Sequence, residues 1–563
     1  MAIRIGVGGE FFDRLREEKC YYVDKTELIY ELVNSGNTVS LFTRPRRFGK
    51  TLMMSMLESF FDIRRDSRDL FEGLNIARHT DFCSKWMNRY PVLFVTFKDA
   101  EGLTFENAYG MLKAIISDIC IKHNYLAASS MVSRPDTEVF ERLMFKTAVD
   151  EEIKNSLHTL LRMMHDHFGR RVILLIDEYD VPLAKAGERK EAGERYYPQM
   201  MEVIRGILST ALKSNEYLKF AVVTGCLKIA RESIFTGANN FASYSVLDDE
   251  FSQYFGFRQE EVKKLLAAAD REEKCGICKE WYDGYHFGNS ALYCPWDVVS
   301  YVAALMKRRD AQPGNYWVNT SGNGILREFV EHTDYDVSDK FEILLNGGTI
   351  MQKVSDELTY GNLYETEENL WSVLLMTGYL TKADPEENGQ TVSLKIPNAE
   401  VAGIFENAVV QLFKDTLDKS RQKQLMTALW DGDEDTATRL ISDFLWDTIS
   451  YHDYHEDYYH AFLTGIFVGL AYGVKSNPEQ GLGRTDITVT DRKKRRAIII
   501  EAKKSTSEDR MEKDCVEALA QIEKNRYVDG LKGYTSVMCY GVAFFRKGAR
   551  VKGLIAKYNT LSE

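Results

Sequence analysis

The stretch 38-TVSLFTRPRRFGKTLMMSMLESFF-61 decides the fold of the N-terminal half of the chain. Its first six residues are mostly apolar or β-branched, and its last ten carry apolar side chains at helical spacing. Between them lies the short loop 44-RPRRFGKT-51. A strand, a tight loop and a helix in this order predict one unit of a parallel α/β sheet, with an anion-binding helix N-terminus beside the loop.

The composition of this loop is typical of a phosphate-binding loop. Lys50 can reach the β- and γ-phosphates of a nucleotide, and the Thr51 hydroxyl can ligate Mg²⁺. Arg44 stands where the pattern G-x-x-x-x-G-K-[ST] has its first glycine, and Pro45 restricts the loop further. We therefore expect ATP to contact Arg46, Arg47, Phe48, Gly49, Lys50 and Thr51. Arg46, Arg47 and Arg231 could equally be surface charges or members of structural ion pairs.

A second acidic element follows at 172-VILLIDEYD-180, where five apolar residues predict a buried strand. Asp177 at its end can hold Mg²⁺ through water, and Glu178 can polarise the attacking water, as in the Walker B element of an ATPase. Thr224 ends another buried run at a position typical of a sensor residue. The other buried runs are 91-PVLFVTF-97 and 220-FAVVTG-225. An ordinary charged strand end is the alternative, which the upstream Gly-Lys-Thr disfavours.

The C-terminal stretch 479-EQGLGRTDITVTDRKKRRAIIIEAKK-504 predicts a second chemical site. Asp486 and Glu501 can share a divalent cation if two adjacent strands hold them side by side. Lys503 emerges on the same face as Glu501, because side-chain direction repeats every second residue. Two carboxylates and an ammonium can bind Mg²⁺ or Mn²⁺, orient a water and offset phosphate charge. The alternative is a hairpin with charged strand ends.

This region resembles the PD-(D/E)XK nuclease superfamily, particularly the nuclease domain that follows AAA-like ATPase domains in bacterial proteins. The segments that carry the likeness are 456-EDYYHAFLTGIFVGL-470, Ser476 to Asp486, Glu501-Ala502-Lys503 and 518-ALAQIEKNRY-527. The resemblance implies that Asp486 and Glu501 are metal ligands and that Lys503 positions water or stabilises the transition state.

The same resemblance implies three further site residues. Either Glu456 or Glu479 would complete the metal site, and Gln521 would approach it from a following helix. Thr485 precedes Asp486 where the motif name has proline, a variation common in the superfamily. In the histidine-rich run 452-HDYHEDYYH-460, the side chains are expected to face solvent or flank Glu456.

The N-terminal half resembles the AAA-ATPase-like domain of the same two-domain bacterial family. The residues that carry this likeness are 21-YYVDKTELI-29, 43-TRPRRFGKTLMMSML-57, 175-LIDEYDVPL-183 and 224-TGCLKIARESIF-235. In that family RPRRFGKT is the usual loop, so Arg44 is a family trait. The resemblance implies nucleotide binding more directly than nucleotide turnover.

With 563 residues the chain is expected to form three α/β or mainly helical domains. We place a P-loop domain over 1–256, a mainly helical middle domain over 257–399 and a restriction-endonuclease-like domain over 400–563. In the middle domain, the helix 370–381 and the hairpin return 391–398 suggest a winged-helix-like module. The aromatic segment 281-WYDGYHFGNSALYCPWDVVSYV-302 is interpreted as core in preference to a base-stacking surface.

Composition bounds the location and the partners. The N-terminus lacks a signal peptide, and the longest apolar run, 461–474, is too short to cross a bilayer and predicts a buried helix. Nine scattered cysteines fit a reducing cytoplasm. The net charge of −12 argues against broad nucleic-acid affinity, so DNA binding would use local basic clusters such as 492-RKKRR-496. That cluster is otherwise a solvated turn.

Three functions fit these observations. The first is an ATP-controlled, metal-dependent DNA nuclease in defence or repair, and the second is a non-catalytic switch that binds ATP and a partner. The third is an NTPase whose nuclease fold only holds nucleic acid. The joint presence of Asp486, Glu501 and Lys503 favours the first over the third, and Glu178 weighs against a pure switch. The acidic net charge and the altered phosphate loop keep the alternatives open.

Overall fold

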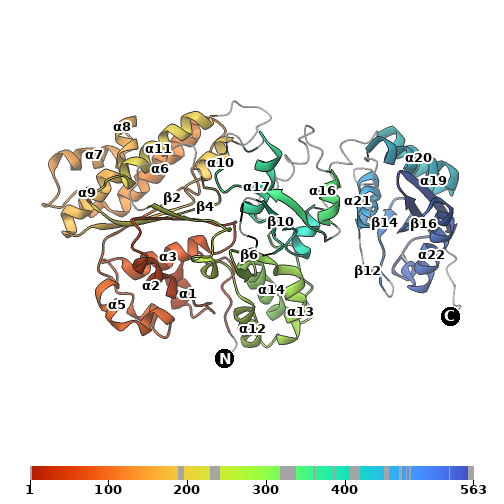
Figure 1. Cartoon of the computed structure of the whole chain (residues 1–563), viewed down its shortest axis with the longest axis horizontal. Helices are drawn as coiled ribbons and strands as arrows, with labels where there is room; N and C mark the ends of the chain where they lie inside the picture. The colour runs from red at the N-terminus through yellow and green to blue at the C-terminus, as the bar shows by residue number, and fades with distance from the viewer. Residues whose placement is uncertain are drawn as a thin grey trace. The chain divides into compact units, whose positions relative to one another are not determined.

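The computed structural model of the chain divides into two compact units (Figure 1). The first comprises residues 1–322 with 351–400, and the second comprises 323–350 with 401–563. The residues that the structure describes are 3–187, 196–228, 241–317, 338–345, 347–358, 360, 363, 365–384, 387, 389, 391–405, 419–448, 456–467, 472–476, 479–480, 483–531 and 533–555.

The described residues of the first unit form a five-stranded parallel sheet in the order β2-β3-β4-β1-β5. Its strands are β1 (Val39–Thr43), β2 (Val92–Thr96), β3 (Val172–Asp177), β4 (Leu218–Gly225) and β5 (Phe241–Tyr244). The expected α/β class and all four strands predicted from apolar runs are confirmed. Thr43 pairs with Gly225, and Thr96 pairs with Asp177, so the ends of these strands meet at one edge of the sheet.

Helices cover both faces of this sheet, which is why its strands are apolar throughout. Figure 1 shows α6, α7, α9 and α11 on one face and α1, α2, α3 and α5 on the other. The helices of this part are α1 (Phe12–Glu17), α2 (Glu27–Asn34), α3 (Lys50–Phe61), α4 (Arg68–Phe71), α5 (Thr80–Trp86), α6 (Phe105–Lys122), α7 (Arg134–Met144), α8 (Asp150–Lys154), α9 (Ser156–Phe168), α10 (Val181–Gly187) and α11 (Tyr197–Leu212).

The rest of the first unit is mainly helical with short hairpins. Its elements are α12 (Gln259–Ala268), α13 (Cys275–Tyr282), β6 (Tyr285–Phe287), β7 (Ser290–Leu292), α14 (Pro295–Lys307), β8 (Ile350–Lys353), α17 (Glu367–Thr377), β9 (Thr381–Lys382) and β10 (Thr391–Lys395). The expected helix followed by a hairpin is present, because β9 pairs antiparallel with β10. Tyr282, Tyr285, Tyr293 and Tyr301 are fully buried, as the interpretation of this segment as core requires. A separate middle domain over 257–399 stays a prediction.

The second unit is built on a mixed sheet, in which the described residues give the order β11-β14-β15-β16-β17. Only β15 and β16 run parallel among these neighbours. The elements are α16 (Ser338–Leu345), α19 (Lys419–Asp431), α20 (Glu434–Thr448), α21 (Glu456–Phe467), β11 (Gly473–Ser476), β12 (Glu479–Gln480), β13 (Gly483–Arg484), β14 (Ile487–Asp491), β15 (Arg496–Lys504), α22 (Met511–Lys524), β16 (Ser536–Phe545) and β17 (Gly548–Ile555). Residues of α19, α20 and α21 form one core with the sheet, and α22 supplies residues to separate clusters.

The prediction of one helix through residue 474 is wrong at its C-terminal end. The helix α21 is described to Phe467, whereas Gly473–Ser476 form strand β11 and pair antiparallel with β14. A short apolar run does not by itself distinguish a buried helix from a buried strand, and pairing with β14 decides the outcome. Among the described residues, no helix has both the length and the apolar content needed to cross a membrane.

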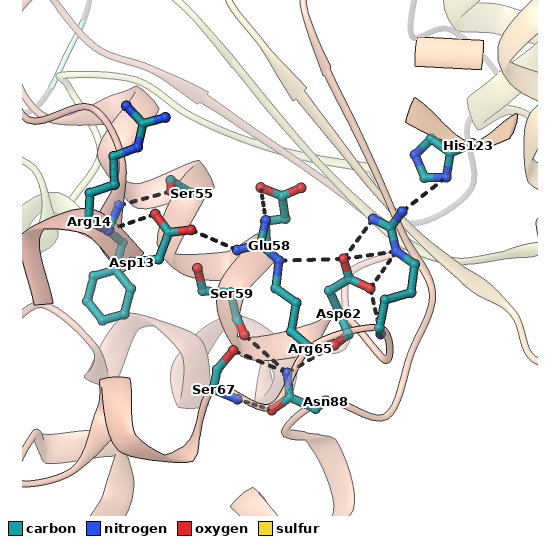
Figure 2. Close-up of polar contacts among 12 residues, drawn as sticks. Asp13, Arg14, Ser55, Glu58, Ser59, Asp62, Arg65, Ser67, Asn88 and His123 are labelled. Atoms are coloured by element: carbon teal, nitrogen blue, oxygen red, sulfur yellow. Dashed lines mark hydrogen bonds and ion pairs between the residues drawn. The ribbon is translucent and has the colours of Figure 1, made fainter. Parts of the chain in front are cut away.

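The helix that follows the phosphate loop, α3, is fixed at its far end by the segment 88–90 (Figure 2). The Asn88 side-chain amide donates to Ser59 O at 3.2 Å and to Asp62 O at 2.9 Å. The backbone N–H groups of Asn88 and Tyr90 donate to the carbonyls of Phe60 and Phe61. The last four carbonyls of the helix therefore all have partners, which a helix end otherwise lacks.

Ion pairs surround the same helix end. Asp62, which is fully buried, accepts hydrogen bonds from the Arg64 guanidinium through both carboxylate oxygens. Arg65 lies 3.0 Å from Asp13 on α1 and 3.5 Å from Glu58 on α3. Figure 2 shows these side chains converging from α1, α3 and the loop that follows α3. The network therefore holds α3 in place.

Replacing Asn88 tests this anchor. Asn88 has a φ of 53°, so Asn88→Gly removes the side-chain hydrogen bonds while keeping an accessible backbone conformation. We expect Asn88→Gly to cost about 1–3 kcal/mol, because the carbonyls of Ser59 in the helix and of Asp62 just after it lose their donor. Asn88→Ala should cost about 1 kcal/mol more through its left-handed backbone. Thermal and urea unfolding would measure both, with the exposed Asn155→Ala as a control; equal stability of wild type and Asn88→Gly would contradict the anchor.

Candidate functional site

The loop 44–49 connects β1 to α3 at the carboxyl edge of the parallel sheet. Gly49 has a φ of 82° and precedes the first residue of α3, and Arg47 has a φ of 73°. Arg44 is not among the residues with positive φ, so the position that usually holds glycine does not need glycine here. Lys50 Nζ donates to Arg44 O and to Pro45 O, both at 2.9 Å. The ammonium thus lies inside the curve of the loop.

The three arginines of the loop have different surroundings. Arg44 is fully buried, and its Nη1 donates to Thr43 O at 2.9 Å and to Tyr244 O at 2.7 Å. Burial lowers the pKa of Arg44 to about 9. The Arg47 guanidinium lies 4.1 Å from the ring centroid of Trp296, whereas Arg46 is exposed. Of the basic cluster 44–47, Arg44 is therefore part of the core, and Arg46 has the most accessible side chain.

Asp177 is the polar centre of the first site. It is fully buried and accepts hydrogen bonds from Thr51 Oγ1 at 2.8 Å and from Thr224 Oγ1 at 2.5 Å. Strand β4 lies between β1 and β3, which brings Thr224 between the loop and Asp177. Burial raises the pKa of Asp177, and the two threonine hydroxyls oppose that rise. Thr51 and Asp177 are close enough for their oxygens to reach one cation.

Glu178 follows Asp177 in an uncommon backbone conformation with a φ of 53°. A residue other than glycine costs about 1–3 kcal/mol in such a conformation, and functional sites are where this cost is often found. Burial raises the pKa of Glu178, and the negative charges of Asp177 and Asp180 raise it further, while Lys50 lowers it. A carboxylate with a raised pKa is a stronger base, which suits activation of a water.

The structure adds three residues that the sequence interpretation did not select. Asp180 accepts hydrogen bonds from the backbone N–H groups of Cys226 and Leu227 at 2.9 and 3.0 Å, and from the Tyr360 hydroxyl at 2.8 Å. Cys226 Sγ lies 3.9 Å from Lys50 Nζ. Asp180 could have been selected from the sequence, because it belongs to the acidic run after β3. No sequence pattern near Cys226 or Tyr360 indicates that these residues lie beside it. Arg231 lies outside the described residues.

In the second unit, strand register brings Asp486 and Glu501 together. Ile487 pairs with Ile500 at this end of the antiparallel ladder of β14 and β15, so Asp486 and Glu501 each adjoin the last pair of the ladder. Asp486 Oδ2 also accepts a hydrogen bond from Ala502 N at 2.7 Å. The two carboxylates therefore lie at the same end of the hairpin.

Neighbouring residues complete the surroundings of Glu501. Glu501 is 2% exposed, and the Gln521 side-chain amide on α22 donates a hydrogen bond to Glu501 Oε1. Lys503, two residues further along β15, lies on the same face of the strand and is partly exposed. Thr485, which stands at the proline position of the motif, is fully buried, and its hydroxyl lies 3.1 Å from that of Thr488.

Of the two expectations for the histidine-rich run, facing solvent is wrong for His460, because its side chain is buried. His460 is 9% exposed, and its Nε2 lies 2.8 Å from Asp486 O. His460 lies four residues after Glu456 and so on the same face of α21, which agrees with the other expectation, that these residues flank Glu456. The side chains of Glu456 and Glu479 lie outside the described part of the chain, although both residues belong to described elements.

The basic run 492–496 forms the turn between β14 and β15, as predicted. Arg496 pairs with Asp491 at 3.2 Å and lies 4.1 Å from the Trp430 ring centroid, and Arg495 donates to Gly533 O. Arg492, Lys493 and Lys494 are exposed. The turn lies at the opposite end of the ladder from Glu501, about 17 Å away along β15 from the strand rise. Its last two arginines therefore have structural partners.

Both sites offer oxygen ligands, which suit Mg²⁺ or Mn²⁺. Thr51 and Asp177 would hold the ion in the first site, and Asp486 and Glu501 would hold it in the second. Within the described ranges, no group of three or more histidine, cysteine or acidic side chains could hold a metal. Each proposed ion would thus have one or two protein ligands, with water or phosphate oxygens as the others, which is the usual coordination of Mg²⁺ in proteins.

Comparison with known proteins agrees with this geometry. Residues 5–235 match a family model described as a predicted AAA-ATPase, and residues 454–552 match the PD-(D/E)XK nuclease superfamily. The chain is 25% identical over 503 residues to an "Uncharacterized protein in vnfD 5'region" of Azotobacter chroococcum mcd 1, covering 86% of this chain and 87% of that protein. The chain therefore combines a predicted AAA-ATPase-like domain with a PD-(D/E)XK nuclease superfamily domain.

Proposed function

We propose that the protein binds and hydrolyses ATP in its first unit and is a metal-dependent DNA nuclease in its second, with nucleotide controlling cleavage in genome defence or repair. The observation that carries the proposal is the pairing of acidic and cationic groups at two separate strand ends. Lys50, Thr51 and Asp177 converge at the first. Asp486 and Glu501 converge at the second.

At the first site, ATP phosphates would replace the loop carbonyls as partners of Lys50. The backbone N–H groups at the start of α3 favour the same phosphates, because a helix N-terminus carries positive partial charge. Thr51 and Asp177 would hold Mg²⁺, which offsets the phosphate charge. Glu178 would accept a proton from the attacking water. Arg46, whose charge is near Glu178 and Asp180, would stabilise the phosphate oxygens.

At the second site, Asp486 and Glu501 would hold Mg²⁺ or Mn²⁺, which lowers the pKa of bound water. Gln521 would keep the Glu501 carboxylate oriented through its amide hydrogen bond. His460 would fix the backbone of Asp486 in the same way. Lys503, on the same strand face as Glu501, would offset the charge of the scissile phosphate. DNA is the substrate that this set of groups fits, and Arg492, Lys493 and Lys494 supply accessible positive charge.

A non-catalytic switch is the second candidate, and the geometry of Lys50 favours it over the NTPase that only holds nucleic acid. Lys50 Nζ already has two loop carbonyls as acceptors, so phosphate binding must displace both. A switch protein would use ATP only to rearrange this loop and thereby a surface that binds a partner. Such a protein would need the same contacts of Lys50 with the loop carbonyls. Turnover of ATP distinguishes the two candidates.

The nucleotide site is tested by two substitutions with opposite signatures. Lys50→Ala removes the charge that faces the phosphates and should weaken ATP binding about 10- to 100-fold, the range of one charge-assisted contact. Glu178→Gln should leave binding within about twofold of wild type while lowering the hydrolysis rate at least about 100-fold, because only the base is lost. Calorimetry and phosphate release would measure these effects.

The exposed Lys264→Ala is the matched control for loss of a lysine in the same unit. Unchanged ATP affinity in Lys50→Ala would contradict the placement of the nucleotide. Full hydrolysis by Glu178→Gln would contradict the role of its carboxylate. Binding without any hydrolysis in wild type would favour the switch.

The nuclease site is tested through metal binding as well as cleavage. Glu501→Ala should abolish calorimetric Mn²⁺ binding at the second unit and lower the cleavage rate at least about 100-fold, because a buried ligand is lost. Gln521→Ala should weaken Mn²⁺ affinity about tenfold, the lower end of the range for a residue that orients a ligand. The exposed Glu523→Ala on the same helix is the control. Equal Mn²⁺ affinity in wild type and Glu501→Ala would remove the metal site.

Control of cleavage by nucleotide is tested by measuring DNA cleavage in different nucleotide conditions and in the variants of both sites. DNA cleavage with Mg²⁺ should change at least about threefold among samples with ATP, with ADP and without nucleotide. Glu178→Gln with ATP should hold the protein at the rate of the ATP-bound state, whereas Glu501→Ala should keep normal ATP binding. Identical cleavage rates in all three nucleotide conditions would refute the control while leaving both sites in place.

A further inference from the structure

A buried pair of carboxyl groups beside the phosphate loop takes no part in the chemistry proposed above. Asp297 on α14 and Glu400 are each 1% exposed. The two carboxyl groups are close enough to influence each other's pKa, and burial raises the pKa of both. Two negative charges side by side in the core repel each other, so the pair favours a state that holds one proton.

Glu400 connects this pair to the loop through Trp317. The Glu400 carboxyl accepts a hydrogen bond from Trp317 N at 2.7 Å. The indole Nε1 of Trp317 in turn donates to Arg46 O at 3.4 Å. The Trp317 ring is 2% exposed and packs edge-on against Tyr379, which fixes its orientation. A shift of Glu400 would therefore move the donor that holds the Arg46 carbonyl.

Asp297 connects the pair to the next carbonyl of the loop. The Cys294 thiol donates to Arg47 O at 3.8 Å, and the Asp297 carboxyl lies close enough to the same thiol to compete for its proton. Trp296, in the same turn of α14, lies under the Arg47 guanidinium. The thiol has a single proton, so it can donate fully to only one of its two acceptors. An ionised Asp297 attracts that proton more strongly than a neutral carbonyl does.

We propose that Asp297 and Glu400 are positioning residues of the phosphate loop, which hold the carbonyls of Arg46 and Arg47 through a proton that the two carboxyls share. This inference rests on the proposed nucleotide binding at that loop. Its consequence is that nucleotide affinity depends on the protonation of a pair that never touches the nucleotide.

The direction of the pH effect follows from burial. Burial raises the pKa of both carboxyls, and the charge of Asp297 raises that of Glu400 further. Loss of the shared proton places two negative charges side by side in the core, which drives the pair apart. When the two carboxyls are separated and hydrated, they release the shared proton more readily than when they are packed together. Rising pH therefore favours the separated pair and, with it, a less firmly held loop. ATP affinity should therefore fall as pH rises through the titration of the pair.

Other titratable groups that face the pair do not produce this effect. They are Arg47, Cys278, Cys294, Tyr282, Tyr285 and Tyr316, and burial raises the pKa of the Cys278 thiol to about 12. Burial raises the pKa of the Cys294 thiol and of all three tyrosines, which keeps these groups neutral while the pair titrates. The Arg47 guanidinium lowers the pKa of Asp297, and burial outweighs it.

The test is the pH profile of ATP affinity between pH 7.5 and 9.5. In wild type, the dissociation constant should rise by up to about tenfold per pH unit, the limit for one linked proton. Glu400→Gln can accept from Trp317 N and donate to Asp297, so it should bind ATP at pH 7.5 within about threefold of wild type. Its profile should be flatter than that of wild type, with Arg44, whose pKa burial lowers to about 9, as a remaining titratable group of the loop. Asp297→Asn should shift the fall in affinity to lower pH, because Glu400 stays titratable but loses the neighbouring charge that raises its pKa further. Glu400→Ala should bind about tenfold more weakly throughout, because Trp317 loses its acceptor.

Asp283→Asn is the matched control. Asp283 is a partly buried carboxyl in the mainly helical part of the first unit, and burial raises its pKa as well. Its profile should follow wild type. A wild-type profile as flat as that of Glu400→Gln, or a flat profile in Asp283→Asn, would overturn the proposal.

Hydrogen exchange of the ligand-free protein separates this proposal from the proposed function. Amides of residues 44–50 should lose protection in wild type relative to Glu400→Gln as pH rises, with or without any nucleotide binding. If ATP bound wild type at no pH, the proposed function would be refuted and the positioning role would not. Equal protection of the loop in wild type and Glu400→Gln at pH 9.5 would remove the positioning role.

Discussion

The buried guanidinium of Arg44 is the interaction on which the first unit depends. A charged group in a protein core costs several kcal/mol unless its partners compensate. Here the carbonyls of Thr43 and Tyr244 accept from Nη1, whereas Nε and Nη2 have no hydrogen-bond partner. The rings of Phe255 and Phe287 lie 4.9 and 5.6 Å from the guanidinium carbon and offer cation–π contacts. These partners come from β1, the end of β5 and the segment beyond residue 250, so one side chain ties the phosphate loop to all three.

The loop is consequently a part of the core on one side and borders the proposed nucleotide site on the other. Phe48 packs against Tyr285 and Phe287, and Pro45 packs against Gly378. Gly378 has a φ of 87°, and a Cβ there would lie 3.0 Å from Pro45, so glycine satisfies both the backbone and the close approach. Packing of this kind fixes the loop before any ligand arrives, which reduces the entropy that binding must overcome. The Asp297–Glu400 pair acts on the same preorganised loop.

In the second unit, the corresponding constraint is strand register. A slip of one residue between β14 and β15 would move Asp486 to the other face from Glu501. Apolar side chains prevent the slip, because Ile498 and Ile500 belong to one buried cluster while Ala497 and Ile499 belong to another. From alternation, the sequence predicted Lys503 on the same face as Glu501, and it predicted Asp486 beside Glu501 if two adjacent strands held them. It did not predict His460, which reaches Asp486 from a helix some 26 residues earlier.

The sequence by itself determined the two chemical motifs, the strands and helices around them and the α/β class, because apolar periodicity and glycine placement are local. It also identified Lys50, Asp177, Asp486 and Glu501 as candidates. Only the tertiary structure decided that Arg44 belongs to the core, that Gly473–Ser476 form a strand, and that Asp180 meets Tyr360. Each of these outcomes depends on a partner distant in sequence, whose hydrogen bonds and buried surface no local pattern encodes.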